Sequence, residues 1–593
     1  MWNKEQQEAI QSVDGAVQVI AAAGSGKSSV LKARVEHMVN DLDIDENEIL
    51  VISFTNATAT ELKKDLEDRL LLDVTVGTFH SICKMLLEGA GYKDLLNQPN
   101  KYRLKRHMET ATGIKNINID DVLSFIGYQQ AFLIGADGEF KHKGCVYDTQ
   151  EIRACYKAYE DYKQQTGTYD FNDWLIHTVN GYANGTIKRT WKYLLLDEAQ
   201  DSNVAQHTLR KLWCPSNNMF LCGDISQSIY GWNGASSLLF ANFYKEVPNT
   251  KVINMNTNYR STTNIVNKAN EFIKPYSEKY GNYKDAVADN NGDGHIETHI
   301  FDDEYNEAAA VIKKIKELVS GGHSLNDMTI LYRNNATADI VESLLKQENI
   351  EYTLMSSQSF FDKKEVKGII ALLRLVANSD DDEAFEICMN EFRCYPLTYF
   401  KKDLIEQLLT EAGKRDCCLF EAFMDHTFEL EWQSKNRNYF IDAINRLKIQ
   451  HDRNLPVDKL IDNIFKVFKI KNMIYENYES SLWDDKIESI VNLQAIARGQ
   501  MLDSFLNIVL KPRINKKQKT SGVVLRTIHS AKGLESEYVF VIGLNDEKFP
   551  SPRAPIDEES HIMYVAVTRA KKWLWVSSIG NSRFFDEYVN EVI

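Results

Sequence analysis

Near its start, the chain carries the segment AVQVIAAAGSGKSSVLKARVEHMV, which constrains the fold more than any other stretch. Its apolar beginning predicts a buried strand, AAAGSGKS predicts a tight glycine turn, and the residues that follow predict a helix. Glycines let backbone N–H groups curl around phosphate oxygens, and the amino end of a helix adds positive potential. The segment therefore predicts a phosphate-binding loop after a strand of an open parallel α/β sheet.

The loop residues are expected to bind nucleotide, and two of them have a specific role. Lys27 would reach the β- and γ-phosphates of ATP, and Ser28 would hold Mg²⁺. The general pattern begins with a glycine where this chain has Ala21, so the loop alone also fits an ordinary glycine turn. The expected nucleotide-binding positions of the loop are Ala22, Ala23, Gly24, Ser25, Gly26, Lys27, Ser28 and Ser29.

A second apolar strand, WKYLLLDEAQD, ends in acidic residues. Asp197 is placed to bind the same Mg²⁺, and Glu198 to orient or deprotonate a water molecule. Acids at a strand end are often simply solvated, but beside a phosphate-binding loop they predict ATP hydrolysis.

The predicted strands form two sets. NMFLCGD repeats the strand-then-acid form within the first set, and roughly residues 95–185 have a helical pattern. A second set comprises KVINMN, HIETHIF, MTILYR and EYTLM, followed by a helix, EVKGIIALLRLVAN. Strands then vanish for a long helical stretch and return at GVVLRTIHS, YVFVIGL and WLWVSS. The pattern predicts two parallel-sheet α/β units, each interrupted by a mainly helical insert.

Bulk composition narrows the class of protein. With 593 residues the chain exceeds a single core, and 44% hydrophobic residues with 26% charged residues describe a globular protein. No apolar run approaches the ~18 residues of a membrane span, and MWNKEQQEAI lacks a secretory pattern. Nine cysteines without a CxxC pair favour reduced thiols. We therefore expect a cytoplasmic protein, nucleoid-associated or in a phage-infected cell, with no membrane partner.

Net charge argues mildly against nucleic acid as a partner, because the formal charge is −15. Two basic runs, KYRLKRH (101–107) and KPRINKKQK (511–519), are either solvated faces or local DNA contacts. ADNNGDGHIE has the spacing of a calcium loop, but Ile300 occupies the position of the closing glutamate, so we expect a turn there.

One short loop, CGDISQSIYGWNGA (222–235), combines two kinds of chemistry. Gln227 suits a phosphate site, whereas the rings of Tyr230 and Trp232 suit nucleobases, on which stacking is worth ~1–3 kcal/mol per base. The ordinary alternative is that both rings are core residues.

Together, these motifs resemble the UvrD/Rep/PcrA-like branch of superfamily 1 DNA helicases over nearly the whole chain. The further segments that carry the resemblance, in order, are NKEQQEAI, FTNATATEL, GTFHSIC, YDFNDWL, NYRS, LYRNNA, FFDKKEVKGIIALLRL, TIHSAKGLE and YVAVTRAK. The resemblance implies two RecA-like domains with helical inserts. Its expected boundaries are 1–94 and 187–258 for the first domain, 95–186 for its insert, 259–378 and 520–593 for the second domain, and 379–519 for the second insert.

The resemblance also assigns roles around ATP. Gln227 would sense the γ-phosphate, and Arg260 and Arg569 would reach it from the second α/β unit as arginine fingers. Gln6 would read adenine, Tyr259 would stack on it, and Glu535 would meet the ribose. The catalytic set implied is Lys27, Asp197, Glu198, Gln227, Arg260 and Arg569.

Single-stranded DNA and its junctions with duplex are the implied partners. The expected DNA contacts are Phe54, Thr55, Asn56, Thr78, His80, Tyr230, Trp232, Arg333, Asn335, Phe361, His529 and Lys532. Among these, Phe361 and His529 also fit as packed core side chains.

The implied function is an ATP-dependent helicase or translocase, 3′-to-5′, acting as a monomer in DNA replication, repair or recombination. In the second insert, FRCYPLTYF replaces the family's glycine-bearing duplex-contacting hairpin. This departure keeps an alternative open: an ATP-switched accessory protein that works through a polymerase or nuclease partner. A component of a phage or antiphage system is a third alternative.

Overall fold

The computed structural model describes residues 2–69, 72–280, 283–290, 292–355, 359–401, 403–478, 483–510, 521–552 and 554–589. The basic run 511–519 lies outside these residues, as does position 291 of the calcium-loop-like segment. The chain forms two compact units. Unit 1 is Met1–His295, Pro550–Lys572 and Asp586–Ile593, and unit 2 is Ile296–Phe549 and Trp573–Phe585.

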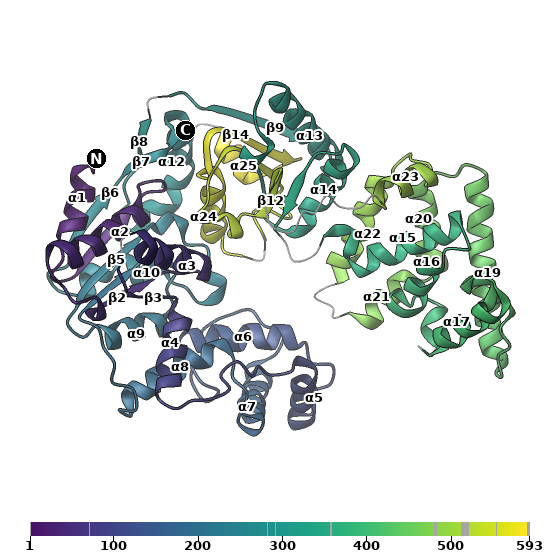
Figure 1. Ribbon diagram of the computed structural model, residues 1–593, viewed down its shortest axis with the longest axis horizontal. Coiled ribbons are helices and arrows are strands. Elements are labelled where there is room, and N and C mark those ends of the chain that lie inside the picture. The colour runs from purple at the N-terminus through teal and green to yellow at the C-terminus, as the bar shows by residue number, and fades with distance from the viewer. Residues whose placement is uncertain are drawn as a thin grey trace. The chain divides into compact units, whose positions relative to one another are not determined.

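Unit 1 is built on a six-stranded parallel sheet of order β3-β2-β4-β5-β1-β6 (Figure 1). Its strands are β1 Val17–Ala21, β2 Ile49–Ile52, β3 Thr75–Gly77, β4 Tyr193–Leu196, β5 Asn218–Gly223 and β6 Lys251–Met255. Strands β1, β2 and β4 are buried along their whole length, which explains their continuous apolar sequences. Because all six strands run the same way, the loops after them gather at one edge of the sheet.

One strand assignment is corrected. The strand pattern groups KVINMN with the second set, although the boundary 187–258 implied by the resemblance includes it in the first domain. In the structure β6 pairs in parallel with β1 over five residues, from Val17 beside Lys251 to Ala21 beside Met255. The pairing covers the edge of β1 that β5 leaves open, and an open strand edge is a liability.

Helices surround this sheet and form its insert. Around the sheet lie α1 Lys4–Gln11, α2 Lys27–Glu36, α3 Asn56–Lys64, α4 Phe79–Gly89, α9 Val204–Trp213, α10 Ser237–Ala241, α11 Phe243–Glu246, α12 Thr263–Ser277 and α24 Ile556–Val567. Between β3 and β4 come α5 Lys101–Thr112, α6 Ile119–Ala131, α7 Thr149–Thr166 and α8 Phe171–Ala183. Helices α5, α6 and α7 share their own core, which includes Met108, Phe125 and Tyr156. A short parallel pair, β7 Thr257–Thr262 and β8 Val287–Asn290, follows β6.

Unit 2 has a second six-stranded sheet, of order β11-β12-β10-β13-β14-β9 (Figure 1). Its strands are β9 His295–Phe301, β10 Met328–Tyr332, β11 Tyr352–Leu354, β12 Val523–Thr527, β13 Ser536–Leu544 and β14 Ala570–Ile579. Strand β10 pairs in parallel with β12 and β13, and β11 pairs in parallel with β12. Helices α13 Glu304–Ser320 and α14 Ala338–Gln347 accompany the sheet, and the last helix, α25 Arg583–Val589, belongs to unit 2 up to Phe585 and to unit 1 from Asp586 on.

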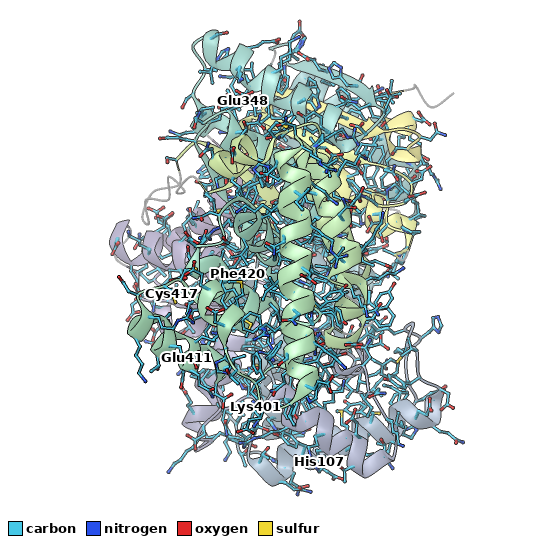
Figure 2. All side chains as sticks on the ribbon, turned by 90° about the vertical axis from the view of Figure 1, so that its right-hand side faces the viewer. His107, Glu348, Lys401, Glu411, Cys417 and Phe420 are labelled. Atoms are coloured by element: carbon cyan, nitrogen blue, oxygen red, sulfur yellow. The ribbon has the colours of Figure 1, made fainter. Side chains whose placement is uncertain are left out.

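A helical bundle lies between β11 and β12 in the chain. Its helices are α15 Lys364–Ala377, α16 Asp382–Glu386, α17 Leu404–Arg415, α18 Leu419–Asp425, α19 Glu431–Asp452, α20 Val457–Val467, α21 Ile470–Asn477, α22 Trp483–Ala497 and α23 Leu502–Val509. One continuous core joins this bundle to the sheet, since it contains both Ile330 and Phe440. Figure 2 shows Glu411, Cys417 and Phe420, which mark the packed pair α17 and α18.

The predicted fold class is confirmed: two parallel-sheet α/β units, each with a mainly helical insert. All nine cysteines are free thiols. In the part of the chain that the structure describes, no helix has the length and apolarity needed to cross a bilayer.

Candidate nucleotide and DNA site

The phosphate-binding loop runs from the end of β1 to the start of α2. Gly24 and Gly26 have φ angles of 70° and 82°, in the left-handed region that favours glycine. A Cβ on Gly24 would also lie 2.7 Å from the Cβ of Arg260. The loop thus needs glycine at both positions, and the first turn of α2 offers backbone N–H groups that the helix itself does not use.

Three residues outside the loop hold its backbone in place. The Asn258 Nδ2 donates to the Ala23 carbonyl at 2.8 Å, and its Oδ1 accepts from the N–H of Arg260 at 2.8 Å. The Tyr259 N–H donates to the Gly24 carbonyl at 2.9 Å. The Gln6 Nε2 donates to the Ser25 carbonyl at 3.1 Å. Asn258 has no assignment from the sequence, although it stands next to the NYRS tyrosine and arginine.

Gln6 and Tyr259, the two expected adenine contacts, both lie beside this loop. The Gln6 Oε1 accepts from the Asn3 N–H at 3.0 Å, so both ends of its amide are hydrogen-bonded within unit 1. Tyr259 is 42% exposed, and its hydroxyl accepts from the Asn3 side chain at 2.8 Å. Glu535 is exposed and belongs to unit 2, directly before β13.

Asp197 and Glu198 follow β4 at the same sheet edge. The Asp197 carboxylate accepts from the Glu198 N–H at 3.0 Å, and the Glu198 Oε2 accepts from the Gln200 Nε2 at 2.6 Å. Glu198 has φ 51°, a left-handed conformation that is uncommon for a residue other than glycine. A carboxylate at Asp197 and a hydroxyl at Ser28 are oxygen ligands that suit Mg²⁺ together with phosphate oxygens.

The loop after β5 carries a hydrogen-bonded chain from Asp224 through Gln227 to Arg569. The buried Asp224 accepts from the Ser226 N–H at 3.0 Å and from the Gln227 Nε2 at 2.6 Å. The Gln227 Oε1 in turn accepts from the Arg569 Nη2 at 3.1 Å. Burial raises the pKa of Asp224, while the Lys27 ammonium and the Gln227 amide oppose the rise.

Arg569 and Arg260 bring two guanidinium groups to this loop. Both are tied to one turn of chain, since the Arg260 Nη1 donates to the Thr568 carbonyl at 3.1 Å and the Arg569 Nη2 to the Thr568 hydroxyl at 3.0 Å. Burial, and then the neighbouring charge of Arg260, lower the pKa of Arg569 to about 9. Two adjacent cations with this environment suit a multiply charged anion.

The unit that carries these arginines differs from the expectation. The sequence places Arg260 and Arg569 on the second α/β unit, whereas the structure groups both with the phosphate-binding loop in unit 1. The reason is local packing: α24, which precedes Arg569, packs against α12 and against the turn 225–227. The Ser261 hydroxyl also donates to the Ala570 carbonyl at 2.6 Å.

The neighbouring strands β2 and β3 end in the residues expected to contact DNA. Thr55 caps α3 by accepting from the Thr58 N–H, and Thr78 caps α4 by accepting from the Ser81 N–H, both at 3.2 Å. The Thr78 hydroxyl donates to the Asn56 Oδ1 at 3.4 Å. Parallel pairing of β2 with β3 thus brings two capped helix starts together.

The loop 222–235 connects two parts of this sheet edge. Gln227 contacts Arg569 among the charged residues, and Tyr230 contacts Phe54 after β2. The Tyr230 ring lies 4.7 Å from the Phe54 ring and 6.4 Å from the Trp232 ring. In the sheet, β4 separates β5 from β2, so the loop crosses over β4 to reach Phe54. Trp232 is 58% exposed, which contradicts the alternative that it is a core residue.

Comparison with known proteins fits this arrangement. Residues 2–248 match the UvrD/REP helicase N-terminal domain, and residues 253–581 match the UvrD-like helicase C-terminal domain. This chain belongs to the UvrD-like helicase family. The chain is also 29% identical over 621 residues to the ATP-dependent DNA helicase PcrA of Staphylococcus epidermidis (strain RP62A), covering 98% of this chain and 84% of that protein. The PcrA of Staphylococcus aureus (strain Mu50) is 28% identical over 627 residues, with the same coverage.

As a UvrD-like helicase, the chain is an ATP-driven DNA helicase. Its first insert adds an aromatic side chain beside the residues that are expected to contact DNA. The His80 ring lies 6.0 Å from Phe171 and 6.5 Å from Trp174, both on α8. Burial lowers the pKa of His80, and Phe171 is 54% exposed. The sequence gives Phe171 no role, although it lies in the motif YDFNDWL. Its exposed ring is brought beside His80, an expected DNA contact, only by the fold.

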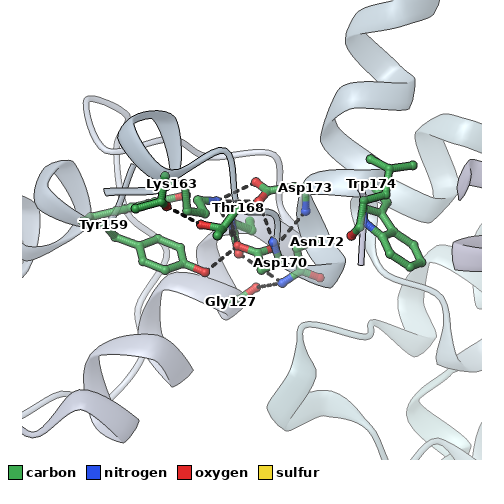
Figure 3. Close-up of polar contacts among 12 residues, drawn as sticks. Gly127, Tyr159, Lys163, Thr168, Asp170, Asn172, Asp173 and Trp174 are labelled. Carbon is green, nitrogen blue, oxygen red and sulfur yellow. Dashed lines mark hydrogen bonds and ion pairs between the residues drawn. The ribbon is translucent and has the colours of Figure 1, made fainter. Parts of the chain in front are cut away.

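A buried ion-pair cluster fixes the start of α8 (Figure 3). The Lys163 Nζ donates to Asp170 at 2.9 Å and to Asp173 at 2.6 and 2.8 Å, and the Tyr159 hydroxyl donates to Asp170 at 2.7 Å. Breaking a buried pair by removing one partner typically costs ~3–5 kcal/mol. The cluster therefore anchors the chain at the start of α8, where Phe171 lies beside His80.

The helicase's second sheet carries the remaining expected DNA contacts at its carboxyl edge. Arg333 and Asn335 follow β10, and His529 and Lys532 follow β12, its parallel neighbour. Phe361 follows β11 and is half-buried, with the Lys346 Nζ 4.7 Å from its ring centre. The structure thus gathers these residues at one edge of unit 2.

Proposed function

We propose that this helicase hydrolyses ATP with Mg²⁺ at the carboxyl edge of the first sheet and thereby moves along single-stranded DNA. The movement would separate strands at junctions with duplex, or displace bound proteins, in DNA replication, repair or recombination. The 3′-to-5′ direction is proposed from the family resemblance of the motif order. We also propose that the protein acts as a monomer in the cytoplasm, where its DNA lies.

Charge and position assign the nucleotide chemistry. Lys27 would bind the β- and γ-phosphates, while Ser28 and Asp197 would hold Mg²⁺, which neutralises charge on the transferred phosphoryl group. Glu198 would orient the attacking water, since its carboxylate is fixed by Gln200. Arg260 and Arg569 would stabilise charge that develops on the γ-phosphate.

One observation supports the proposal that ATP hydrolysis is coupled to DNA binding. The loop 222–235 hydrogen-bonds to Arg569 and also carries the aromatic rings proposed to stack on bases. Gln227 accepts from Arg569, and three residues further on Tyr230 packs against Phe54. A γ-phosphate that attracts Arg569 or Gln227 must change their mutual bond. The loop would then shift, and with it the ring of Trp232. Stacking on exposed rings grips any base, so the grip would follow the nucleotide state without reading sequence.

The accessory-protein alternative retains one supporting observation in the second insert. Where relatives carry a glycine-bearing hairpin, this chain presents Tyr399, which is 57% exposed beside Arg393 and Lys469. A surface of this kind fits a protein partner as well as DNA. The assembled Glu198, Gln227 and Arg569 favour turnover over a passive switch.

The test combines hydrolysis with directional movement. Steady-state ATP hydrolysis is measured with and without single-stranded oligonucleotides, and streptavidin release is measured from strands biotinylated at either end. We expect hydrolysis to rise with DNA and release to occur from the 5′ end only. Hydrolysis that ignores DNA would contradict the motor and favour the accessory protein. Release from the 3′ end would contradict the direction.

A further inference from the structure

The turn after β4 and the loop after β5 are joined by a buried glutamine that has no role assigned so far. Gln200 is fully buried at the sheet edge. Its Nε2 donates to the Glu198 Oε2 at 2.6 Å, and its Oε1 accepts from the Asp224 N–H at 3.0 Å. One amide thus touches the residue expected to orient water and the first residue of the loop that carries Gln227 and Trp232.

Two further contacts bind the same pair of segments. The Ser228 hydroxyl donates to the Gln200 carbonyl at 3.3 Å, and the Ser236 N–H donates to the Ser202 carbonyl at 3.1 Å. The loop is therefore attached to the turn at Asp224, at Ser228 and, just beyond its last residue, at Ser236. Of these contacts, the Gln200 side chain alone continues to the Glu198 carboxylate.

A glycine on the neighbouring strand leaves room for the Gln200 side chain. A Cβ built on Gly223 would fall within contact distance of the Gln200 Oε1 and 3.1 Å from the Phe240 ring. Glycine at position 223 therefore leaves the space that the amide occupies. Glu198 has a left-handed backbone, which persists only where the surroundings hold it, and the Gln200 amide is one group that holds its carboxylate.

We propose that Gln200 is a positioning residue that orients Glu198 according to the position of the loop 222–235. When DNA fixes Tyr230 and Trp232, the loop holds the Asp224 N–H against Gln200, and Gln200 holds the Glu198 carboxylate toward the attacking water. Without DNA the loop is less constrained, and Glu198 is less well aligned. This inference rests on the proposed function and explains how occupancy by DNA would reach the chemical step.

The test compares Gln200→Met with Gly223→Ala, which would displace the amide without replacing it, and with Gln206→Met as a matched control. Gln206 is a buried glutamine six residues along the chain that only caps α9, through its Oε1 and the Asn203 N–H at 3.1 Å. All proteins are first checked for cooperative thermal unfolding. The measurements are kcat and KM for ATP, with and without saturating single-stranded DNA.

We expect Gln200→Met and Gly223→Ala to lower the DNA-stimulated kcat about 10- to 100-fold, the range for a lost hydrogen bond to a charged group. KM for ATP should stay within about twofold, and Gln206→Met should match the wild type. Adding Trp232→Ala to Gln200→Met should cost little more, since both act on one path. The proposal would be overturned if the effects of Gln200→Met and Trp232→Ala on kcat were fully additive. It would also be overturned if Gln200→Met lowered kcat equally with and without DNA. A wild-type enzyme that ignores DNA would instead overturn the proposed function.

Discussion

The carboxyl edges of the two parallel sheets use one scaffold for two kinds of surface. On the first sheet, Asp224, Gln227 and Arg569 are almost fully buried and bonded to one another. On the second, Asn335 is exposed, while Arg333 and Lys532 are half-exposed. Phosphoryl transfer needs fixed dipoles away from water. Single-stranded DNA that moves along a protein needs charged and aromatic side chains on the surface, where they can contact its backbone and bases. Burial, more than fold, separates the two roles.

This difference predicts that variants of the buried, charged residues at the first edge should alter the chemical step, and variants of the exposed residues at the second edge should alter the affinity for DNA. The loop 222–235 is the exception, because it is buried at Gln227 and exposed at Trp232. It should therefore show both kinds of effect.

The largest effect is expected for Arg569→Ala. It removes the proposed arginine finger and leaves the Gln227 Oε1 without the donor at 3.1 Å, so kcat for ATP should fall about 10³-fold. Stopped-flow phosphate release at saturating DNA measures it. Arg210→Lys is the control, because Arg210 is equally buried but pairs with Glu246 of α11. A similar kcat loss in both variants would show that burial of an arginine, rather than its place beside Gln227, is what matters.

Next in size is Lys27→Ala, which removes the ammonium that we propose binds the ATP phosphates. We expect kcat to fall about 10²- to 10³-fold with the melting temperature unchanged, as for loss of one group that stabilises charge in the transition state. Lys32→Ala, on the same helix and paired with Asp65, should hydrolyse ATP like the wild type. Turnover that survives in Lys27→Ala would remove the phosphate-binding role of the loop.

Phe54→Ala tests the boundary between the two kinds of surface. The ring packs on Tyr230, so its loss should weaken binding to single-stranded DNA about 5- to 100-fold, as for one stacked base. Fluorescence anisotropy with a labelled oligonucleotide measures this. Tyr102→Ala, a 77% exposed tyrosine within the basic run 101–107, is the control and should bind normally. Weaker binding in Tyr102→Ala would instead place DNA on that basic helix.

The smallest effect is expected for Arg333→Ala at the second edge. Loss of one phosphate contact should weaken DNA binding several-fold for every sequence and reduce the slope of log K against log salt by about 1. At saturating DNA, kcat should equal that of the wild type. A large fall of kcat there would break the distinction between the two edges.

Much of this site follows from local sequence. Asp197 and Asp224 end apolar strands, and the glycines of the phosphate-binding loop need left-handed angles, so both features can be read from neighbours along the chain. The sequence of the loop 222–235 also predicts contacts of two kinds, and the structure places Gln227 against Arg569 and Tyr230 against Phe54.

The remainder depends on contacts between distant segments. The roles of Asn258 and Gln200 arise because the strands before them align at one edge, and the exposed ring of Phe171 gains meaning only beside His80. Strand β6 was placed in the wrong sheet for the same reason, since five residues do not specify a partner strand. Helix α24 likewise groups Arg569 with unit 1 through packing that its own sequence does not reveal.

The most direct test of the coupling is the ratio of kcat with and without saturating single-stranded DNA, compared between wild type and Trp232→Ala. Trp232 is exposed and lies five residues from Gln227, so its removal should leave hydrolysis without DNA unchanged. We predict that the ratio falls severalfold even when DNA saturates the variant. Without the Trp232 ring, DNA binding would no longer change the position of the loop at Gln227. An unchanged ratio, with only a higher DNA concentration needed for saturation, would show that Trp232 grips DNA without coupling it to ATP.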